Sequence, residues 1–338
     1  MTTVSTPQTS STSLRGRLRD MVTQREFGVF LALVTFFTVM YAISPVFRKP
    51  YNLMIILRQI SVTGIVAMGQ TLVVISGAFD LSQAPVAALS AMTTALAWNR
   101  LGWSPIPAML LGLCIATACG FLNGLLASRL KLHPIVMTLA SGSMFTGLTY
   151  FLTEGKSTVG LPKQMTWLGQ GRIQGVPVPV AILFIVTIVM HLMLTRTLFG
   201  QRVLMVGGNA KAAEDIGLDV KQLRLGIFTI SGFLAGLGGI VLLGRVGTAL
   251  PQMANDMLFP VVTATIVGGT LLSGGVGSMA GTLMGAGIMG IVRNSLAVLQ
   301  ANIYLQDFFQ GVLVVGALLM DVVRRGELTW DQIIGKER

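Results

Sequence analysis

Long apolar runs dominate this sequence and restrict the folds open to it. Runs of about 18 residues or more, such as 177–195 and 225–246, recur in a chain that is 53% hydrophobic and 11% charged. About 20 helical residues cross the roughly 30 Å hydrocarbon core of a bilayer, where backbone groups must bond within their own segment. A transmembrane β-barrel would show alternating segments of about ten residues, which this sequence lacks. The sequence therefore predicts an all-α polytopic membrane protein.

About ten membrane-spanning helices are predicted, within a transmembrane domain over 26–323. The 40 glycines fit such a bundle, because small residues let helix backbones approach closely in lipid. Residues 1–25 are polar and then basic, and we expect a disordered cytoplasmic tail there. Residues 324–338 are expected to form a second cytoplasmic tail. The predicted spans are 27–45, 52–77, 85–98, 105–127, 134–152, 177–195, 225–246, 256–272, 279–297 and 303–321.

The net charge of +11 could indicate a nucleic-acid-binding surface, but the placement of the charges indicates membrane topology instead. Most lysines and arginines fall in the two tails and in alternate loops, which the positive-inside rule assigns to the cytoplasm. Both termini are therefore expected in the cytoplasm, and nucleic acid is not an expected partner. The basic residues on this side are Arg15, Arg17, Arg19, Arg25, Arg129, Lys131, Arg196, Arg202, Lys211, Lys221, Arg224, Arg324, Arg325, Lys336 and Arg338.

Two glycine-containing segments interrupt predicted spans. The first, V-I-S-G-A-F-D-L-S-Q, covers 74–83, and the second has five glycines within 268–277. Such a density of glycine favours a helix break, a re-entrant turn or close helix approach. Two longer polar connections, about 153–176 and 196–224, are expected on opposite sides of the membrane. Each could meet a partner or simply cover helix ends.

The inner connection contains the charged stretch G-G-N-A-K-A-A-E-D-I-G-L-D, residues 207–219. Asn209 can cap a helix of about two turns, and Gly217 can end that helix in a left-handed conformation. Ala213, Ile216 and Val220 would share one face. A helix this short is too polar to enter the membrane and marginal in water, so it requires a partner surface.

This stretch resembles the cytoplasmic coupling motif of ABC-importer permeases, A-A-x-x-x-G, and is similar to the form found in sugar permeases of the ribose-transporter type. Three further stretches agree in order: I-S-G-A-F-D-L-S at 75–82, V-T-A-T-I-V-G-G-T-L-L-S-G-G-V-G-S at 262–278, and G-T-L-M-G-A-G-I-M-G-I-V-R-N-S-L at 281–296. Lys211 departs from the general motif, which has Glu, and 78–79 and 83–85 also differ from the usual residues.

The resemblance implies a permease subunit in a bacterial inner membrane that pairs with a second permease and rests on cytoplasmic ATPases. The short helix would bind a groove on the ATPase, and the outer loop would face a periplasmic sugar-binding protein. The substrate would be a monosaccharide or related polyol; branched-chain amino acids or nucleosides are the alternatives within the class. The implied coupling residues are Asn209, Lys211, Ala212, Ala213, Glu214 and Gly217.

The sequence contains no catalytic cluster and no complete nucleotide-binding motif. G-K-S-T at 155–158 lacks the first glycine of a P-loop, because Tyr150 stands at that position. We therefore expect no enzyme, no cofactor and no metal site in this chain, with ATP and Mg²⁺ bound by the partner ATPase. No series of acidic residues crosses the membrane, which weakens the alternative of an ion-coupled secondary transporter. Hydrogen-bonding side chains suffice for a neutral solute, and the candidates, each equally able to join two helices, are Thr63, Gln70, Ser76 and Asn123.

Overall fold

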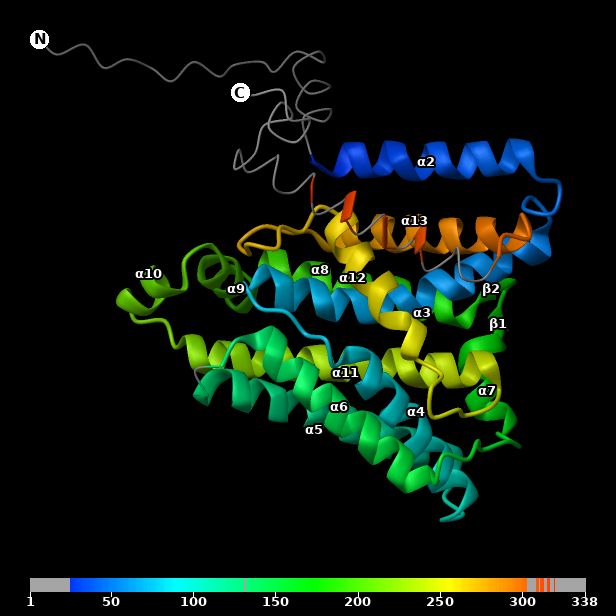
Figure 1. Cartoon of the computed structure of the whole chain (residues 1–338), viewed down its shortest axis with the longest axis horizontal. Helices are drawn as coiled ribbons and strands as arrows, with labels where there is room; N and C mark the ends of the chain where they lie inside the picture. Colours follow the sequence, from blue (N-terminus) through cyan, green and yellow to red (C-terminus); the bar gives the residue numbers. More distant parts are fainter. Residues whose placement is uncertain are drawn as a thin grey trace, which may run out of the picture.

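The structure, a computed structural model, describes residues 25–130, 132–302, 308–309, 311–312, 315–316 and 319. Helices make up most of these residues and run side by side as one bundle (Figure 1). Among the described helices, six are long and apolar enough to cross a membrane, which makes the chain a multi-pass membrane protein. These six are α2 (Arg25–Ile43), α3 (Pro50–Ile75), α5 (Pro105–Arg129), α6 (Pro134–Thr153), α8 (Val178–Arg196) and α11 (Val220–Val246).

Three more of the predicted spans coincide with helices of the same bundle. The span 85–98 lies in α4 (Gln83–Asn99), and 279–297 lies in α13 (Met279–Val298). The span 256–272 is divided between the short 3-10 helix η1 (Asn255–Met257) and α12 (Leu258–Val267), and its last five residues, 268–272, lie in the loop that follows. The predicted tails 1–25 and 324–338, apart from Arg25, and most of the span 303–321 lie outside the described residues.

Both predicted interruptions are real breaks in the helices. Helix α3 ends at Ile75 and α4 begins at Gln83, while α12 ends at Val267 and α13 begins at Met279. Gly77 turns the chain after α3 with a backbone φ of +77°, which residues other than glycine rarely adopt. Pro85 follows within the first turn of α4, where its missing N–H is not needed.

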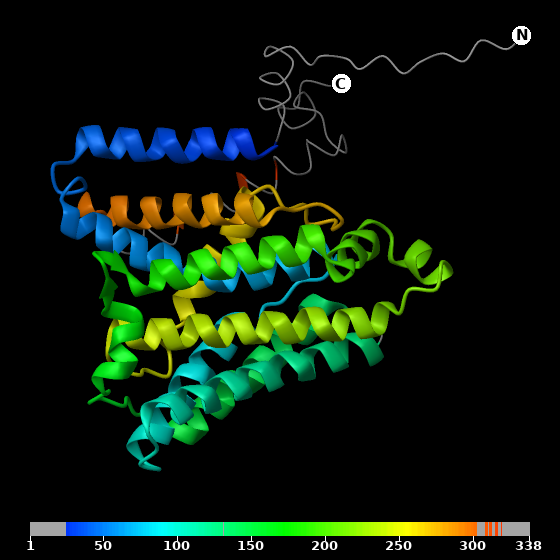
Figure 2. The same ribbon diagram turned by 180° about the vertical axis from the view of Figure 1, so that it is seen from behind.

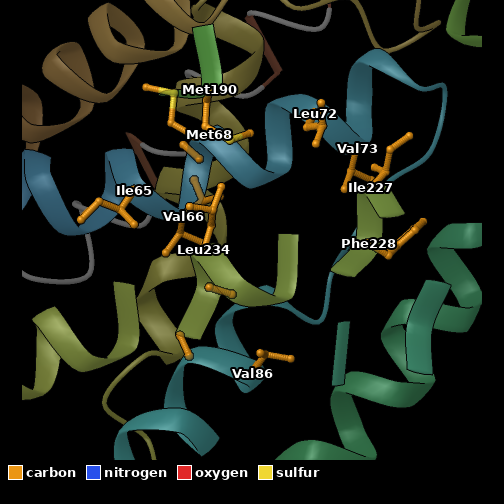
Figure 3. Close-up of a cluster of buried hydrophobic side chains, with 14 of the residues drawn as sticks. Ile65, Val66, Met68, Leu72, Val73, Val86, Met190, Ile227, Phe228 and Leu234 are labelled. Atoms are coloured by element: carbon orange, nitrogen blue, oxygen red, sulfur yellow. The ribbon is translucent and has the colours of Figure 1, made fainter. Parts of the chain in front are cut away.

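Helix α3 forms the centre of the bundle. Every residue from Ser61 to Ile75 is buried, and α3 packs against α8, α11, α12 and α13. Figure 3 shows apolar side chains of α3, such as Val66 and Val73, beside Leu234 and Ile227 of α11. Helix α2, by contrast, packs on the outside against α13 and is mostly exposed. An apolar helix that leaves most of its surface uncovered is suited to contact lipid tails.

Glycine brings the backbones of α5 and α11 into direct contact. A Cβ on Gly120 would lie 2.4 Å from the carbonyl oxygen of Phe228 and 2.8 Å from the Cα of Gly232. A Cβ on Gly232 would lie 2.6 Å from the carbonyl oxygen of Ala116. Because lipid supplies no hydrophobic force between helices, this close packing is what holds α5 on α11.

The two long polar connections lie at opposite ends of the bundle, as predicted (Figures 1 and 2). One end carries α7 (Lys163–Gln170) and the hairpin of β1 (Arg172–Ile173) with β2 (Val176–Pro177). The other end carries α9 (Leu198–Gly208) and α10 (Ala210–Asp215). We call these the hairpin end and the α10 end. The sequence prediction missed α9, because an 11-residue amphipathic helix resembles the end of the preceding span.

Candidate functional site

Helix α10 forms where the charged stretch predicted a short helix. Oδ1 of Asn209 accepts a hydrogen bond of 3.0 Å from the backbone nitrogen of Ala212, which caps the helix. Gly217 ends the segment with a φ of +87°. Asp219 then caps α11 through its Oδ1, which accepts from the nitrogen of Gln222 at 2.9 Å. Asn209 thus fixes the start of a six-residue helix that would be unstable alone, and Gly217 and Asp219 define the turn that leads from it into α11.

The side chains of α10 mostly face outward. Within the helix only Ala213 is buried, at 3% exposure, against α9 and α11. The other predicted coupling residues are exposed, which leaves them free to contact another protein. Ile216 is 71% exposed and so does not join the buried face expected for it with Ala213 and Val220. The exposed members of the predicted set are Asn209, Lys211, Ala212, Glu214 and Gly217.

A cavity of about 500 Å³ lies beside α10, between α9 and α11. Its apolar wall includes Phe199 and Leu223, and its polar wall includes Arg202 and Gln222. Gly217 also lines it, so the cavity opens directly beside the end of the short helix. This arrangement offers a recess for a side chain of a protein that contacts α10.

The break between α3 and α4 is held by a buried polar network. Asp80 is 2% exposed, and its Oδ1 accepts from the nitrogen and the hydroxyl of Ser82 at 2.9 and 2.6 Å. Its Oδ2 accepts from the hydroxyl of Ser231 on α11 at 3.1 Å. Nε2 of Gln83 donates to the same Ser231 oxygen at 2.7 Å. The network gives the non-helical segment hydrogen bonds that water cannot supply there.

Two of the predicted pathway residues belong to this region and bond within the protein. Nδ2 of Asn123 on α5 donates to the Ser82 hydroxyl at 2.7 Å. The hydroxyl of Ser76 donates to the carbonyl oxygen of Val73 at 2.6 Å, at the end of α3. Both side chains are buried. In this conformation Asn123 joins α5 to the break, whereas the Ser76 bond is local to the end of α3.

A second cavity, of about 340 Å³, lies near the hairpin end, between α3, α11, η1 and α13. Thr63, the third predicted pathway residue, lines it together with Gln59 one helical turn earlier. Asn294 lines it from α13 and is fixed by a reciprocal amide pair with Asn52, each Nδ2 donating to the other Oδ1 at 2.9 Å. We call this cavity the α3–α13 pocket.

Charged side chains of both signs surround the α3–α13 pocket. Arg245, Arg293 and Asp256 line it, and Arg293 donates to the backbone oxygen of Asp256 at 3.3 Å. Within the described residues, no carboxylate lies within ion-pair distance of either guanidinium. The sequence pattern gave no reason to group these residues, because they come from three separate elements.

Gln70, the fourth predicted pathway residue, lies on the same face of α3 as Thr63, about two helical turns further along. Its side chain is fully buried, and among the described residues neither amide atom has a hydrogen-bond partner. An unsatisfied buried amide costs stability, and such a group in a native structure requires an explanation. Thr63 and Gln70 thus lie on one line leading inward from the pocket, whereas Ser76 and Asn123 belong to the break.

Comparison with known sequences decides the family. Residues 52–318 match the family described as branched-chain amino acid transport system / permease component. The chain belongs to this permease family. Relatives include the ribose import permease protein of Bacillus subtilis (strain 168), 33% identical over 301 residues that cover 88% of this permease and 92% of the relative. The D-allose transport system permease protein of Escherichia coli (strain K12) is 32% identical over 298 residues, covering 88% and 91%.

A third relative is the autoinducer 2 import system permease protein of Enterobacter sp. (strain 638), 31% identical over 316 residues, covering 93% of this permease and 92% of that protein. The permease also shares its fold with an inward-facing ABC transporter described as of metal-chelate type. The TM-score is 0.50 at 19% identity, over 89% of this permease and 98% of that chain. The permease is therefore a transport component with an ABC transporter fold.

Proposed function

We propose that this permease imports a monosaccharide or a related polyol as the membrane-spanning subunit of an ATP-driven ABC importer. The observation that carries the proposal is its similarity to ribose and D-allose permeases at over 30% identity across about nine tenths of each chain. The α3–α13 pocket supports it, because Gln59, Thr63 and Asn294 offer the neutral hydrogen-bonding groups that suit hydroxyls.

In the proposed assembly the α10 end faces the cytoplasm and the hairpin end faces the periplasm of a bacterial inner membrane. The basic residues of the α9–α11 region, including Arg202 and Lys211, favour this orientation. Both termini are then cytoplasmic. About ten spans result if α4, the η1–α12 segment, α13 and the segment 303–321 are counted with the six long helices. The breaks at 76–82 and 268–278 would lie at membrane depth, protected by protein as such segments require.

Helix α10 is the proposed contact with a cytoplasmic ABC ATPase. Its exposed residues Lys211, Ala212 and Glu214 would enter a groove on that subunit, and the neighbouring 500 Å³ cavity would accept one of its side chains. ATP and Mg²⁺ would be bound by the ATPase, and this chain would bind no cofactor. A second permease and a periplasmic sugar-binding protein complete the proposed importer.

The proposed solute route begins in the α3–α13 pocket and continues along α3 from Thr63 to Gln70. The free amide of Gln70 would accept and donate hydrogen bonds to solute hydroxyls. Ser76 and Asn123 would be reached after the break between α3 and α4 rearranges. Alternating access then requires the two ends of the bundle to open in turn.

A branched-chain amino acid is the second candidate solute, and one observation favours it. Asp256 lies in the pocket with Arg245 and Arg293, so both charges needed to pair with a zwitterion are present. The ribose and D-allose permeases, which match over about nine tenths of each chain, favour a sugar as the solute over an amino acid.

The test is uptake into proteoliposomes that contain the permease with the ATPase that co-purifies in mild detergent, with the co-purifying sugar-binding protein added outside. We expect ATP-dependent uptake of radiolabelled D-ribose or D-allose, reduced by unlabelled sugar and unaffected by leucine. Uptake of leucine in place of sugar would select the second candidate. Sugar uptake at the same rate without ATP would contradict an ATP-driven importer.

A further inference from the structure

Three distant segments of the chain meet backbone to backbone where α9 ends. They are the end of α3 at Ile75 and Gly77, the end of α9 at Gly207, and the loop after α12 at Gly274 and Gly275. The nitrogen of Gly275 donates a hydrogen bond of 2.7 Å to the carbonyl oxygen of Ile75, which joins the two helix breaks directly. We call this contact the backbone clasp.

Gly207 packs on that hydrogen bond. A Cβ on Gly207 would lie 1.7 Å from the carbonyl oxygen of Ile75 and 2.5 Å from the nitrogen of Gly275. Real Cβ atoms do not approach so closely, so no side chain fits there without moving one of the breaks. Gly208, the next residue, has nothing within 4 Å of the same position. The backbone of Gly208 also adjoins the clasp, since a Cβ on Gly275 would lie 2.8 Å from its Cα, but a side chain added at Gly208 would point away from it. Of the two glycines, only Gly207 would direct an added side chain into the clasp.

Gly274 completes the clasp. Its φ of +85° favours glycine, and a Cβ on it would lie 2.7 Å from the carbonyl oxygen of Gly207 and 2.9 Å from the Cα of Gly77. Gly269, in the same loop, has a similar φ of +89° but nothing within 4 Å. The positive φ alone therefore accounts for a glycine at position 269. At position 274 glycine is also required because a side chain would collide with Gly207 and Gly77.

The clasp lies between the parts of the proposed importer that must move together. Asn209, the cap of α10, follows Gly207 by two residues. Asp80 and its hydrogen-bonded network follow Gly77 by three residues. Backbone atoms in contact have no side-chain rotamers that could absorb a displacement, and close-packed interiors transmit strain. A displacement of α9 and α10 would therefore act on both breaks at once.

We propose that Gly207 and Gly274 are positioning residues that couple movement of α10 to the two helix breaks. This proposal rests on the proposed function, because it takes α10 as the ATPase contact. It goes further in naming the contact through which nucleotide-driven motion reaches the membrane domain. Couplings of this kind typically change an equilibrium by about 5- to 150-fold.

The experiment uses the full chain assembled with its co-purifying ATPase in proteoliposomes, with the co-purifying sugar-binding protein added outside. Two matched pairs of variants are compared. Gly207→Ala is compared with Gly208→Ala, since both replace a helical glycine and only the first meets backbone atoms. Gly274→Ala is compared with Gly269→Ala, since both place alanine at a positive φ and only the first meets the clasp. The gain in helix propensity is the same for Gly207→Ala and Gly208→Ala, and the backbone strain of alanine at a positive φ is the same for Gly274→Ala and Gly269→Ala. Differences within a pair therefore report the clasp.

Two readouts are measured for each variant. The first is the ratio of D-ribose or D-allose taken up to ATP hydrolysed. The second does not depend on the solute: it is the rate at which a maleimide labels Ser273→Cys, beside the clasp, with and without ATP and vanadate. Cys114 and Cys119 are both replaced by alanine for this measurement. Ser273 is exposed, so its cysteine variant can report a change at the second break.

We expect Gly207→Ala and Gly274→Ala to hydrolyse ATP while the uptake ratio falls about tenfold and the nucleotide effect on labelling disappears. Gly208→Ala and Gly269→Ala should behave like the unmodified chain. Equal behaviour within either pair of folded variants would overturn the proposal. If Gly207→Ala fails to insert, the Gly274 and Gly269 pair decides.

The unmodified chain separates failure of this inference from failure of the proposed function. If it shows nucleotide-dependent labelling but no sugar uptake, the solute assignment fails, and the labelling comparison still decides the clasp. If nucleotide leaves labelling of the unmodified chain unchanged, the clasp carries no motion and the inference is overturned.

Discussion

Ser231 on α11 donates its hydroxyl to Oδ2 of Asp80 at 3.1 Å, which fastens the break between α3 and α4 to a helix far along the chain. The same hydroxyl accepts from Nε2 of Gln83 at 2.7 Å. Each of these bonds satisfies a buried polar group that would otherwise have no partner. The stability of the break therefore depends on this network.

The carboxyl of Asp80 accepts three hydrogen bonds, two of them from Ser82. Asp80→Ala would leave three buried donors without an acceptor, and we expect a loss of about 3 kcal/mol of stability in detergent. Thermal unfolding followed by circular dichroism measures it. Glu154→Ala is the control, because Glu154 forms only an exposed ion pair with Lys156 and should cost almost nothing. Equal midpoints for the two variants would contradict the importance of the network.

Gln70 and Gln83 should respond to the same substitution with opposite effects on stability. Gln70→Leu removes an amide that has no partner among the described residues, so stability should stay the same or rise. Uptake should fall with a raised KM, because a hydrogen-bonding group on the proposed route is lost. Gln83→Leu breaks the bond to Ser231 and should lower stability by about 1–3 kcal/mol.

The measurements for this pair are thermal unfolding and the KM of sugar uptake. Destabilisation by Gln70→Leu would show that the amide has a structural partner. Unchanged uptake would remove Gln70 from the route.

The cap of α10 should be required for coupling. Asn209→Ala removes the hydrogen bond to Ala212 and should cost the helix about 1 kcal/mol, or about a fivefold change in its population. We expect ATP-dependent uptake to fall by a similar factor while membrane insertion is unchanged. Asn209→Asp keeps an acceptor oxygen and should restore uptake. Failure of Asp to rescue, with Ala impaired, would assign Asn209 a direct contact instead of a cap.

The contact between α5 and α11 should not tolerate a larger side chain. Gly120→Val would place methyl groups where the Phe228 carbonyl and Gly232 now lie, and should cost about 3 kcal/mol or more. Gly147→Val on α6 is the matched control, because nothing lies within 4 Å of that Cβ position. The yield of monodisperse protein in detergent and its unfolding temperature distinguish the two. Comparable yields and temperatures would show that α5 and α11 can separate without loss.

Features that depend on neighbouring residues were predictable from the sequence. The apolar runs predicted the long helices, and Asn209 with Gly217 predicted α10, because a cap and a left-handed terminus act within a few residues. Gly77 and the glycines of 268–277 predicted the breaks for the same reason. Helix α9 was missed. Its 11 residues include apolar ones like those of the preceding span, and only the packed structure shows that they form a separate helix.

The candidate site was only partly predictable. Thr63 and Gln70 were chosen as polar residues within a span; Thr63 lines the α3–α13 pocket, and Gln70 lies about two turns further along the same face of α3. Asn123 and Ser76 were chosen on the same ground, but Asn123 bonds to Ser82 in the break and Ser76 bonds to Val73 at the end of its own helix. Residue type alone could not separate these roles. A buried polar side chain that finds a hydrogen-bond partner in the protein stabilises the fold, and the identity of that partner depends on tertiary packing.

The sequence by itself determined that this chain lies in a membrane as helices, where those helices break, and where a short capped helix follows. Hydrophobic length, glycine conformation and capping act over at most one helix, so the local residues suffice. Only the tertiary structure decided that Gly207 touches Ile75 and Gly275, that Asp80 meets Ser231, and that Gln70 has no partner in the part of the chain that is described. These relationships join residues from different helices, and their distances depend on how the whole bundle packs.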